Sequence, residues 1–217
     1  GIALAGGLRE RWDLLFWMLI GAIAMRGAGC VWNDMVDRDL DRQVARTASR
    51  PIASGMVSMR AAAIWAGALC LIGLAVLVQL PWLAQVVAVA SVALVAAYPF
   101  MKRITWWPQA WLGMVYSWGA LVGWVAVGGP VGPAVLMLYA GCILWTIGYD
   151  TIYALQDIED DALVGVKSSA RAMGQHVRGG VAFCYTAALG VWGAAICQVR
   201  PDAVALVALL PITLHFI

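Results

Sequence analysis

Charged side chains are scarce in this sequence. Only 12% of its 217 residues are Asp, Glu, Lys or Arg, and 63% are hydrophobic, whereas soluble domains are typically about a quarter charged and about half apolar. The shortage of charge excludes an ordinary soluble domain and indicates a membrane protein. The net charge of +2 is uninformative, because the few charges are strongly segregated along the chain.

Cysteine and histidine are too few and too dispersed for the metal sites that they usually form. The five cysteines lie far apart in apolar surroundings, with no CxxC pair and no histidine beside them. His176 and His215 are isolated, and neither has a partner at ligand spacing. We therefore expect no zinc or redox centre and interpret the cysteines as small core residues. They are Cys30, Cys70, Cys142, Cys184 and Cys197.

Long apolar runs are abundant instead. An α-helix needs roughly 20 residues to cross a bilayer core, and segments of that length are separated here by Gly- and Pro-containing turns or by basic connections. They lie at about residues 14–33, 60–80, 82–101, 106–127, 133–154 and 178–199, and a seventh begins near residue 203. The sequence predicts an all-α, polytopic transmembrane helix bundle of about seven helices, forming a single domain over residues 1–217.

The two ends of the chain bear on this count. There is no initiator Met and no signal-peptide architecture, and Ile217 ends inside an apolar run. We expect the domain to be truncated at both termini, so that seven spans is a lower bound.

Basic residues mark one side of the expected bundle. Ten of the fourteen Lys and Arg residues fall on alternate connections, which lie on the same side of the membrane and are cytoplasmic by the positive-inside rule. Nine of the twelve acids fall in two stretches, residues 34–41 and 150–161, at the cytoplasmic ends of the first and fifth spans. We therefore expect the two acidic stretches to meet.

The first acidic stretch begins at Asn33. On a continuous helix Asn33, Asp37 and Asp41 are spaced i, i+4, i+8, and Asp34 joins the same face. Carboxylates stacked in this way repel one another, and the usual remedy is Mg²⁺, which bridges one or two carboxylates to substrate phosphates. The alternative is a solvated loop with helix-capping aspartates and arginine salt bridges.

The second acidic stretch repeats the spacing. Asp150, Tyr153 and Asp157 lie on one helical stripe, and Asp161 follows Asp157 by one turn. Asp150 lies at the margin of an apolar span, where an ionisable group is costly and by default functional. Two such clusters that converge on one cavity can hold Mg²⁺ ions that neutralise a diphosphate.

Basic residues accompany both stretches. Arg46 and Arg50 follow the first stretch, and Lys167 follows the second. Guanidinium and ammonium groups in these positions can bind phosphate oxygens. The alternative is that they act only as topology determinants.

Three segments resemble a known family. The run from Arg26 to Asp41, continuing from Arg46 to Gly55, resembles the NDxxDxxxD signature of the UbiA superfamily of intramembrane prenyltransferases. Residues 150–161 and 165–169 resemble its second motif, in the form typical of 4-hydroxybenzoate polyprenyltransferases of ubiquinone synthesis. Residues 98–113 match a third segment of that subfamily.

The resemblance implies a fold and a reaction. Members have nine helices around a lipid-open cavity, of which this chain lacks the first and ends within or after the eighth. With Mg²⁺ held by the two motifs, the allylic C–O bond of a polyprenyl diphosphate ionises and the carbocation attacks the carbon ortho to the hydroxyl of 4-hydroxybenzoate. Metal ions and cations beside the leaving group stabilise the charge that develops there, and the prenyl tail stays in lipid.

The resemblance also assigns roles by motif position. It implies five Mg²⁺ ligands, acting directly or through water: Asp34, Asp37, Asp41, Asp157 and Asp161. It also implies that Asn33 binds the metal or the diphosphate together with them. Lys102 and Arg103 bind diphosphate or anchor the third span. Asp150 and Tyr153 orient or activate the acceptor. Arg26 binds the acceptor carboxylate or pairs with Asp150 in helix packing.

Two alternatives remain at this stage. The first is another prenyltransferase of the superfamily, whose acceptor is haem, a chlorophyll precursor or a naphthoate. The second is a divalent-cation transporter, which would place its acids at mid-membrane depth. The expected partners are polyprenyl diphosphate, 4-hydroxybenzoate and membrane lipid, with no nucleic acid. The expected location is a bacterial inner membrane, crossed several times, or by analogy the mitochondrial inner membrane.

Overall fold

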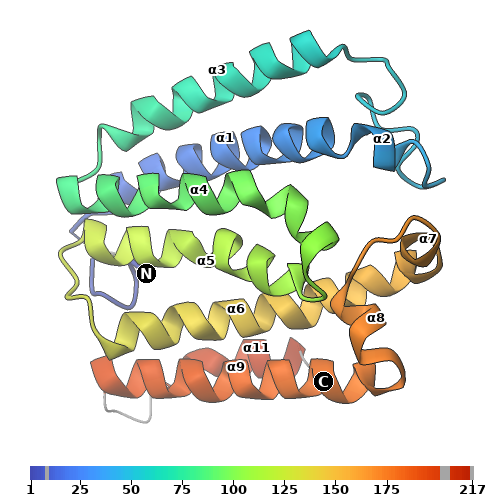
Figure 1. The fold of residues 1–217 in the computed structure, drawn as a ribbon. Coiled ribbons are helices and arrows are strands. Elements are labelled where there is room, and N and C mark those ends of the chain that lie inside the picture. Colours follow the sequence, from blue (N-terminus) through green and yellow to red (C-terminus); the bar gives the residue numbers. More distant parts are fainter. Residues whose placement is uncertain (8–9, 201–205, 216–217) are drawn as a thin grey trace.

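The chain folds as a bundle of long helices (Figure 1). The computed structural model describes residues 1–7, 10–200 and 206–215, and no β-strand occurs among them. The long helices are α1 (Trp12–Val36), α3 (Met59–Leu77), α4 (Trp82–Ile104), α5 (Pro108–Ala126), α6 (Pro133–Ala154) and α9 (Val177–Val199). The prediction of an all-α bundle is confirmed, and each of the six complete apolar segments forms one of these helices.

Short helices connect or follow the long ones. They are α2 (Arg38–Asp41), η1 (Leu155–Asp157), α7 (Ile158–Leu163), α8 (Ser169–Met173), η2 (Gly174–His176), η3 (Val207–Leu209) and α11 (Leu210–His215). The expected seventh span begins among residues 201–205, which lie outside the described residues.

The long helices pack in the order α3, α1, α4, α5, α6, α9 (Figure 1). The contact between α6 and α9 is close because glycines on α6 face rings on α9. A Cβ atom added at Gly148 would lie 2.5 Å from the Tyr185 ring, and one added at Gly141 would lie 2.5 Å from Trp192. The end of α6, which carries Asp150, is therefore held firmly against α9.

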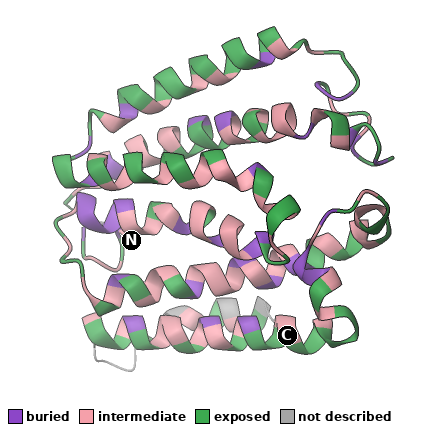
Figure 2. Cartoon of the chain, viewed as in Figure 1, coloured by how far each residue is buried: buried purple, intermediate pink, exposed green. Residues whose placement is uncertain are grey.

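Five helical segments in the described part of the chain are long and apolar enough to cross a membrane. Helix α5 is not among them, and it lies between α4 and α6 with nine buried residues (Figure 2). Its polar groups are satisfied by these neighbours: Trp118 Nε1 donates to the Val87 carbonyl of α4 at 2.7 Å, and the Met114 carbonyl accepts from the Tyr139 hydroxyl of α6 at 2.9 Å. Helix α5 is therefore packed inside the bundle against both neighbours.

The outward faces of the bundle are apolar. On α3, for example, Ile64 and Leu71 are exposed (Figure 2), as suits helices whose outer faces contact lipid. Cys30, Cys70 and Cys197 lie on such exposed surfaces, and Cys184 is buried. The interpretation of the cysteines as core residues was therefore wrong for these three, because a membrane helix is apolar on its outer face as well as on its packed face.

Proline sets the geometry of the helix ends near the acidic stretches. Pro99 lies inside α4, where its ring removes one backbone hydrogen bond, and the last turns of α4 bend toward α5 (Figure 1). Pro108 occupies the first turn of α5, where a missing N–H costs nothing. The corner between α4 and α5 therefore turns toward the ends of α1 and α6.

The connections that carry most of the charge lie at one end of the bundle. The segment after α1, the α4–α5 corner and the segment from α6 to α9 share this end, at the right of Figure 1. The expectation that the two acidic stretches meet is confirmed. The assignment of this end to the cytoplasm stays a prediction.

Candidate functional site

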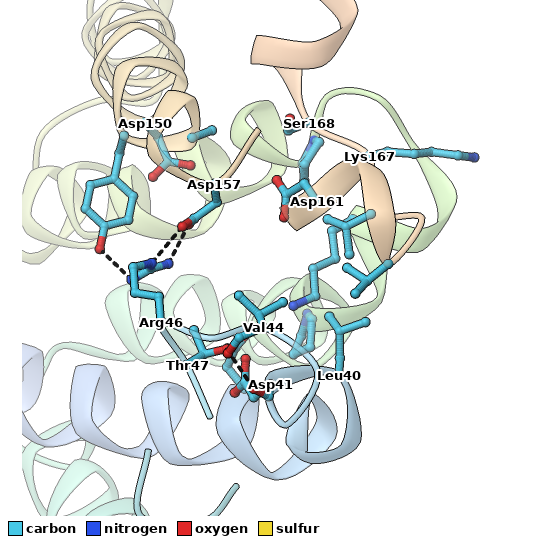
Figure 3. Close-up of a pocket in the computed structure, with 18 of the residues that line it drawn as sticks. Leu40, Asp41, Val44, Arg46, Thr47, Asp150, Asp157, Asp161, Lys167 and Ser168 are labelled. Atoms are coloured by element: carbon cyan, nitrogen blue, oxygen red, sulfur yellow. Dashed lines mark hydrogen bonds and ion pairs between the residues drawn. The ribbon is translucent and has the colours of Figure 1, made fainter. Parts of the chain in front are cut away.

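A polar cavity of about 220 Å³ opens at this end of the bundle, between the two acidic stretches (Figure 3). Most of the predicted site residues line it: Asn33, Asp41, Arg46, Arg50, Lys102, Asp150, Tyr153, Asp157, Asp161 and Lys167. The other four, Arg26, Asp34, Asp37 and Arg103, do not line it. The cavity therefore gathers residues from every predicted functional segment.

The first motif does not continue as one straight helix. Helix α1 ends at Val36, Asp37 has non-helical dihedral angles, and α2 begins at Arg38. The Asp41 N–H still donates to the Asp37 carbonyl at 2.8 Å, so the i, i+4 spacing survives this break. Asp37 lies at the joint between the two helices and is fully buried.

Arg50 joins two carboxylates of the first motif. Its NH1 group lies 3.1 Å from Asp34 Oδ1 and 2.9 Å from Asp41 Oδ2. Asp41 is 5% exposed, so its charge is compensated mainly by this guanidinium. The arginine salt bridges of the alternative interpretation are thus present: those of Arg50 are partly buried, and a further one joins Arg42 to the exposed Asp39 at 3.5 Å.

Asp37 is fully buried and held by the end of α4. Its Oδ2 atom accepts a hydrogen bond from Lys102 Nζ at 2.5 Å, and its Oδ1 atom accepts one from Arg103 NH2 at 3.3 Å. A buried carboxylate needs such partners because an uncompensated buried charge is very costly. Lys102 and Arg103 therefore tie the first motif to α4.

Arg46 connects the first motif to the second. Its Nε atom donates to Asp157 Oδ1 at 2.7 Å, and its NH2 group donates to Asp157 Oδ2, in a two-pronged ion pair (Figure 3). A third bond runs from NH1 to the Tyr153 hydroxyl at 3.3 Å. The Asp157 carboxylate raises the pKa of the Arg46 guanidinium above its ordinary value. Arg46, in the loop after α2, thus binds Asp157 at the start of the segment between α6 and α8.

Two acids of the second motif, Asp150 and Asp161, line the cavity without an ion pair. Neither Asp150 nor Asp161 lies within salt-bridge distance of a cation among the described residues. Both line the cavity, and Figure 3 shows the Asp161 carboxylate facing the cavity from the side opposite Asp41. They are therefore the carboxylates best placed to accept a further cation or proton donor.

Arg26 and Lys167 contact groups outside the two acidic motifs. The Arg26 guanidinium lies 5.7 Å from the centre of the Tyr116 ring, and it forms no salt bridge with Asp150 in the described structure. Lys167 Nζ donates to the Ile104 carbonyl at 3.1 Å, and Figure 3 shows its side chain extending away from Asp157. Their expected substrate contacts stay predictions.

Among the cavity-lining residues that sequence reasoning missed are Tyr98 and Gln109. Both belong to the third matched segment, from which only Lys102 and Arg103 were chosen. Tyr98 precedes Lys102 by four residues, so the two share a helix face, and this spacing was the available signal. Gln109 carries no charge and follows a proline, and only the folded α4–α5 corner brings it to the cavity.

The donor set fits a magnesium ion that arrives with its phosphate ligand. Within the described residues no three His, Cys, Asp or Glu side chains are grouped as a ready-made metal site. Mg²⁺ does not need one, because it typically takes one or two carboxylates, several waters and substrate phosphates. Carboxylates of both motifs and the Asn33 amide surround one cavity beside Arg46, Arg50 and Lys102, which suits a metal–diphosphate pair.

Comparisons with known proteins agree with this geometry. Residues 1–217 match the UbiA prenyltransferase family. The chain is 44% identical over 212 residues to the mitochondrial 4-hydroxybenzoate polyprenyltransferase of Rattus norvegicus, covering 96% of this chain and 57% of the relative. It is 50% identical over 171 residues to that of Bos taurus, covering 78% of this chain and 46% of the relative. The chain thus spans about half the length of these relatives.

Solved structures show the same arrangement of helices. The apo structure of a UbiA homolog from Aeropyrum pernix superposes with a TM-score of 0.82 at 29% identity, covering 93% of this chain and 76% of that one. A digeranylgeranylglyceryl phosphate synthase superposes with a TM-score of 0.59 at 18% identity, covering 93% of this chain and 83% of that one, a likeness of fold alone. A cation transporter is disfavoured, since the acids gather at one end of the bundle rather than along its length.

Proposed function

Because the chain belongs to the UbiA prenyltransferase family, we propose that it transfers a polyprenyl group from polyprenyl diphosphate to 4-hydroxybenzoate. The new bond forms at the ring carbon ortho to the hydroxyl, in a Mg²⁺-dependent step of ubiquinone biosynthesis. The acceptor is taken from the names of the relatives, which are 4-hydroxybenzoate polyprenyltransferases. The proposed location is a bacterial inner membrane, or the mitochondrial inner membrane by analogy with those names.

The observation that carries this proposal is the convergence of both acidic motifs and several basic residues on one cavity. Arg46 joins the motifs through Asp157, and Arg50 and Lys102 line the same cavity. A cavity with carboxylates and guanidinium groups side by side can bind a divalent cation and a diphosphate together. Five helices with membrane-spanning length and composition suit a substrate whose long tail stays in lipid.

The leaving group is the focus of the proposed chemistry. Cleavage of the allylic C–O bond leaves both bonding electrons on the diphosphate oxygen, so negative charge develops there. Arg46, Arg50 and Lys102 stabilise that charge more in the transition state than in the ground state, and Lys167 and Arg103 are proposed to assist. Bound Mg²⁺ supplies further charge neutralisation as a Lewis acid, and its proposed ligands are Asp34, Asp37, Asp41, Asp157 and Asp161, aided by Asn33.

The acceptor is proposed to lie deeper in the bundle, beside Asp150. Asp150 and Tyr153 line the cavity one turn apart on α6, and they orient or activate the phenol of 4-hydroxybenzoate. The ring carbon attacks the prenyl carbocation, a C–C bond forms, and the ring proton passes to water or to the released diphosphate. Arg26, on helix α1, is proposed to bind the acceptor carboxylate.

A transfer assay tests this proposal. Membranes containing the full protein are incubated with a labelled polyprenyl diphosphate and 4-hydroxybenzoate, with Mg²⁺, with EDTA, and with EDTA followed by excess Mg²⁺. We expect prenylated 4-hydroxybenzoate to form with Mg²⁺, to be lost with EDTA and to return when Mg²⁺ is restored.

Other acceptors serve as the control. A naphthoate, a haem and a chlorophyll precursor are expected to give little product in the same membranes. Transfer to one of these but not to 4-hydroxybenzoate would move the protein within its family, and product formation that persists in EDTA would contradict the role of Mg²⁺.

A further inference from the structure

A cluster of uncharged polar side chains lies directly behind the second motif. Gln109, Thr151 and Ser169 come from three different helices, α5, α6 and α8, and they are 5%, 0% and 0% exposed. Buried polar groups are retained in proteins when they are hydrogen-bonded, since an unpaired one destabilises the fold. The hydrogen bonds of these three residues therefore identify the part of the chain that the cluster positions.

The cluster fixes the first residue of α8. Gln109 Oε1 accepts a hydrogen bond from the Ser169 backbone N–H at 3.0 Å, and the Thr151 and Ser169 hydroxyls lie 2.6 Å apart. Amides in the first turn of a helix have no partner within the helix, so an acceptor from elsewhere must satisfy them. Here α5 supplies that acceptor, and α6 supplies the hydroxyl contact.

The start of α8 is also the end of the segment that carries the second motif. Residues 155–168 leave α6 with Asp157 and Asp161 and return at Ser168, which lines the cavity as Gln109 does. Just before α8, the Lys167 N–H donates to the Lys102 carbonyl at 2.9 Å. The Lys167 side chain also donates to the Ile104 carbonyl at 3.1 Å. The far end of this segment is thus fastened to the α4–α5 corner at three points, and Gln109 supplies the one that lies on α5.

We propose that Gln109 is a positioning residue for the second acidic motif. By accepting the Ser169 N–H, it sets where residues 155–168 return to the bundle, and thereby where Asp157 and Asp161 lie relative to the first motif. The identity of the ligand, Mg²⁺ with a diphosphate, rests on the proposed function, whereas the positioning role rests on the contacts of Gln109. Partners that orient metal ligands typically affect metal affinity or activity by roughly 10- to 100-fold when they are removed.

Three variants of the full protein in detergent test this role. Gln109→Met keeps the length of the side chain but removes the acceptor. Gln109→Glu restores an acceptor oxygen at the same place. Gln85→Met is the matched control, because Gln85 donates to the Leu80 carbonyl at 2.8 Å at the opposite end of α4.

Two measurements are made on each variant: backbone hydrogen exchange of residues 155–169 by mass spectrometry, and calorimetric binding of inorganic diphosphate in the presence of Mg²⁺. For Gln109→Met we expect faster exchange in this segment, unchanged exchange in residues 59–77, and binding weaker by roughly 10- to 100-fold. Gln109→Glu is expected to return the exchange to the wild-type rate, and Gln85→Met to match the wild type in both measurements.

Three results would overturn the positioning role. The first is wild-type exchange and wild-type affinity in Gln109→Met. The second is weaker binding by Gln109→Met without faster exchange, which would mean that Gln109 contacts the ligand directly, and the third is no recovery of exchange in Gln109→Glu. If Gln109→Met does not fold, Thr151→Val replaces it, with the same expected direction. Hydrogen exchange needs no substrate, so wild-type protein that fails to bind diphosphate would count against the proposed function and leave the positioning test intact.

Discussion

Replacing Asp157 with Asn is expected to lower kcat/KM for prenyl transfer by roughly a thousandfold. The change removes a proposed Mg²⁺ ligand, and metal stabilisation of transition-state charge is worth several kcal/mol, each 1.36 kcal/mol being about tenfold in rate. It also releases Arg46, whose Nε atom donates to Asp157 Oδ1 at 2.7 Å. Initial rates in membranes at saturating Mg²⁺ measure the effect, and Glu159→Gln, an exposed change two residues away, is expected to leave the rate unchanged.

A double-mutant cycle separates the two roles of Asp157. If this carboxylate serves only to hold Arg46, then Arg46→Gln lowers the rate at least as much as Asp157→Asn does, and the double variant is no worse than Arg46→Gln. If Asp157 also serves the metal, the double variant is worse than Arg46→Gln, and Asp157→Asn raises the Mg²⁺ concentration needed for half-maximal rate, which Arg46→Gln does not. Activity of Asp157→Asn within tenfold of the wild type would remove Asp157 from the proposed reaction.

Replacing Asp37 with Asn is expected to destabilise the protein by roughly 3 kcal/mol, because removing one partner of a buried ion pair leaves the other charges uncompensated. The Asp37 side chain is fully buried, and the Lys102 side chain that binds it at 2.5 Å is 24% exposed. The control lies two residues away: the Asp39 side chain is 88% exposed and 3.5 Å from Arg42, so Asp39→Asn is expected to change stability by less than about 0.5 kcal/mol.

Thermal unfolding in detergent measures both changes. A clear fall in the unfolding midpoint for Asp37→Asn, beside an unchanged midpoint for Asp39→Asn, is the expected pattern. Equal midpoints for the two variants would show that the contacts of Asp37 with Lys102 and Arg103 contribute little. A stable Asp37→Asn variant that had lost Mg²⁺-dependent diphosphate binding would instead assign Asp37 chiefly to the metal.

The meeting of the two motifs could be predicted from the sequence, and the ion pairs within them could not. Alternation of charged and uncharged connections places residues 34–41 and 150–161 at one end of any helical bundle, which the structure confirms. The partners of each carboxylate depend on the path of the chain between α2 and α3. That path brings Arg50 back to Asp34 and Asp41 and sends Arg46 across to Asp157, and no local periodicity encodes it.

The break in the helix at Asp37 is a second feature that the spacing of the acids did not predict. The helix is interrupted at Asp37 although the i, i+4 hydrogen bonds persist on both sides of it. The spacing also does not name the partner of Asp37, which is the end of α4. Repulsion among the acids was expected to be relieved by metal. In the structure Arg50, Lys102 and Arg103 already relieve part of it.

The central claim is that the two motifs form one site for Mg²⁺ and diphosphate, and a calorimetric titration tests it most directly. Inorganic diphosphate is titrated into the wild type, Asp34→Asn and Asp157→Asn, each with Mg²⁺ and with EDTA. We predict that the wild type binds only with Mg²⁺ and that each substitution, one in either motif, weakens binding. Equal binding in EDTA, or wild-type binding by either variant, would contradict a shared metal–diphosphate site.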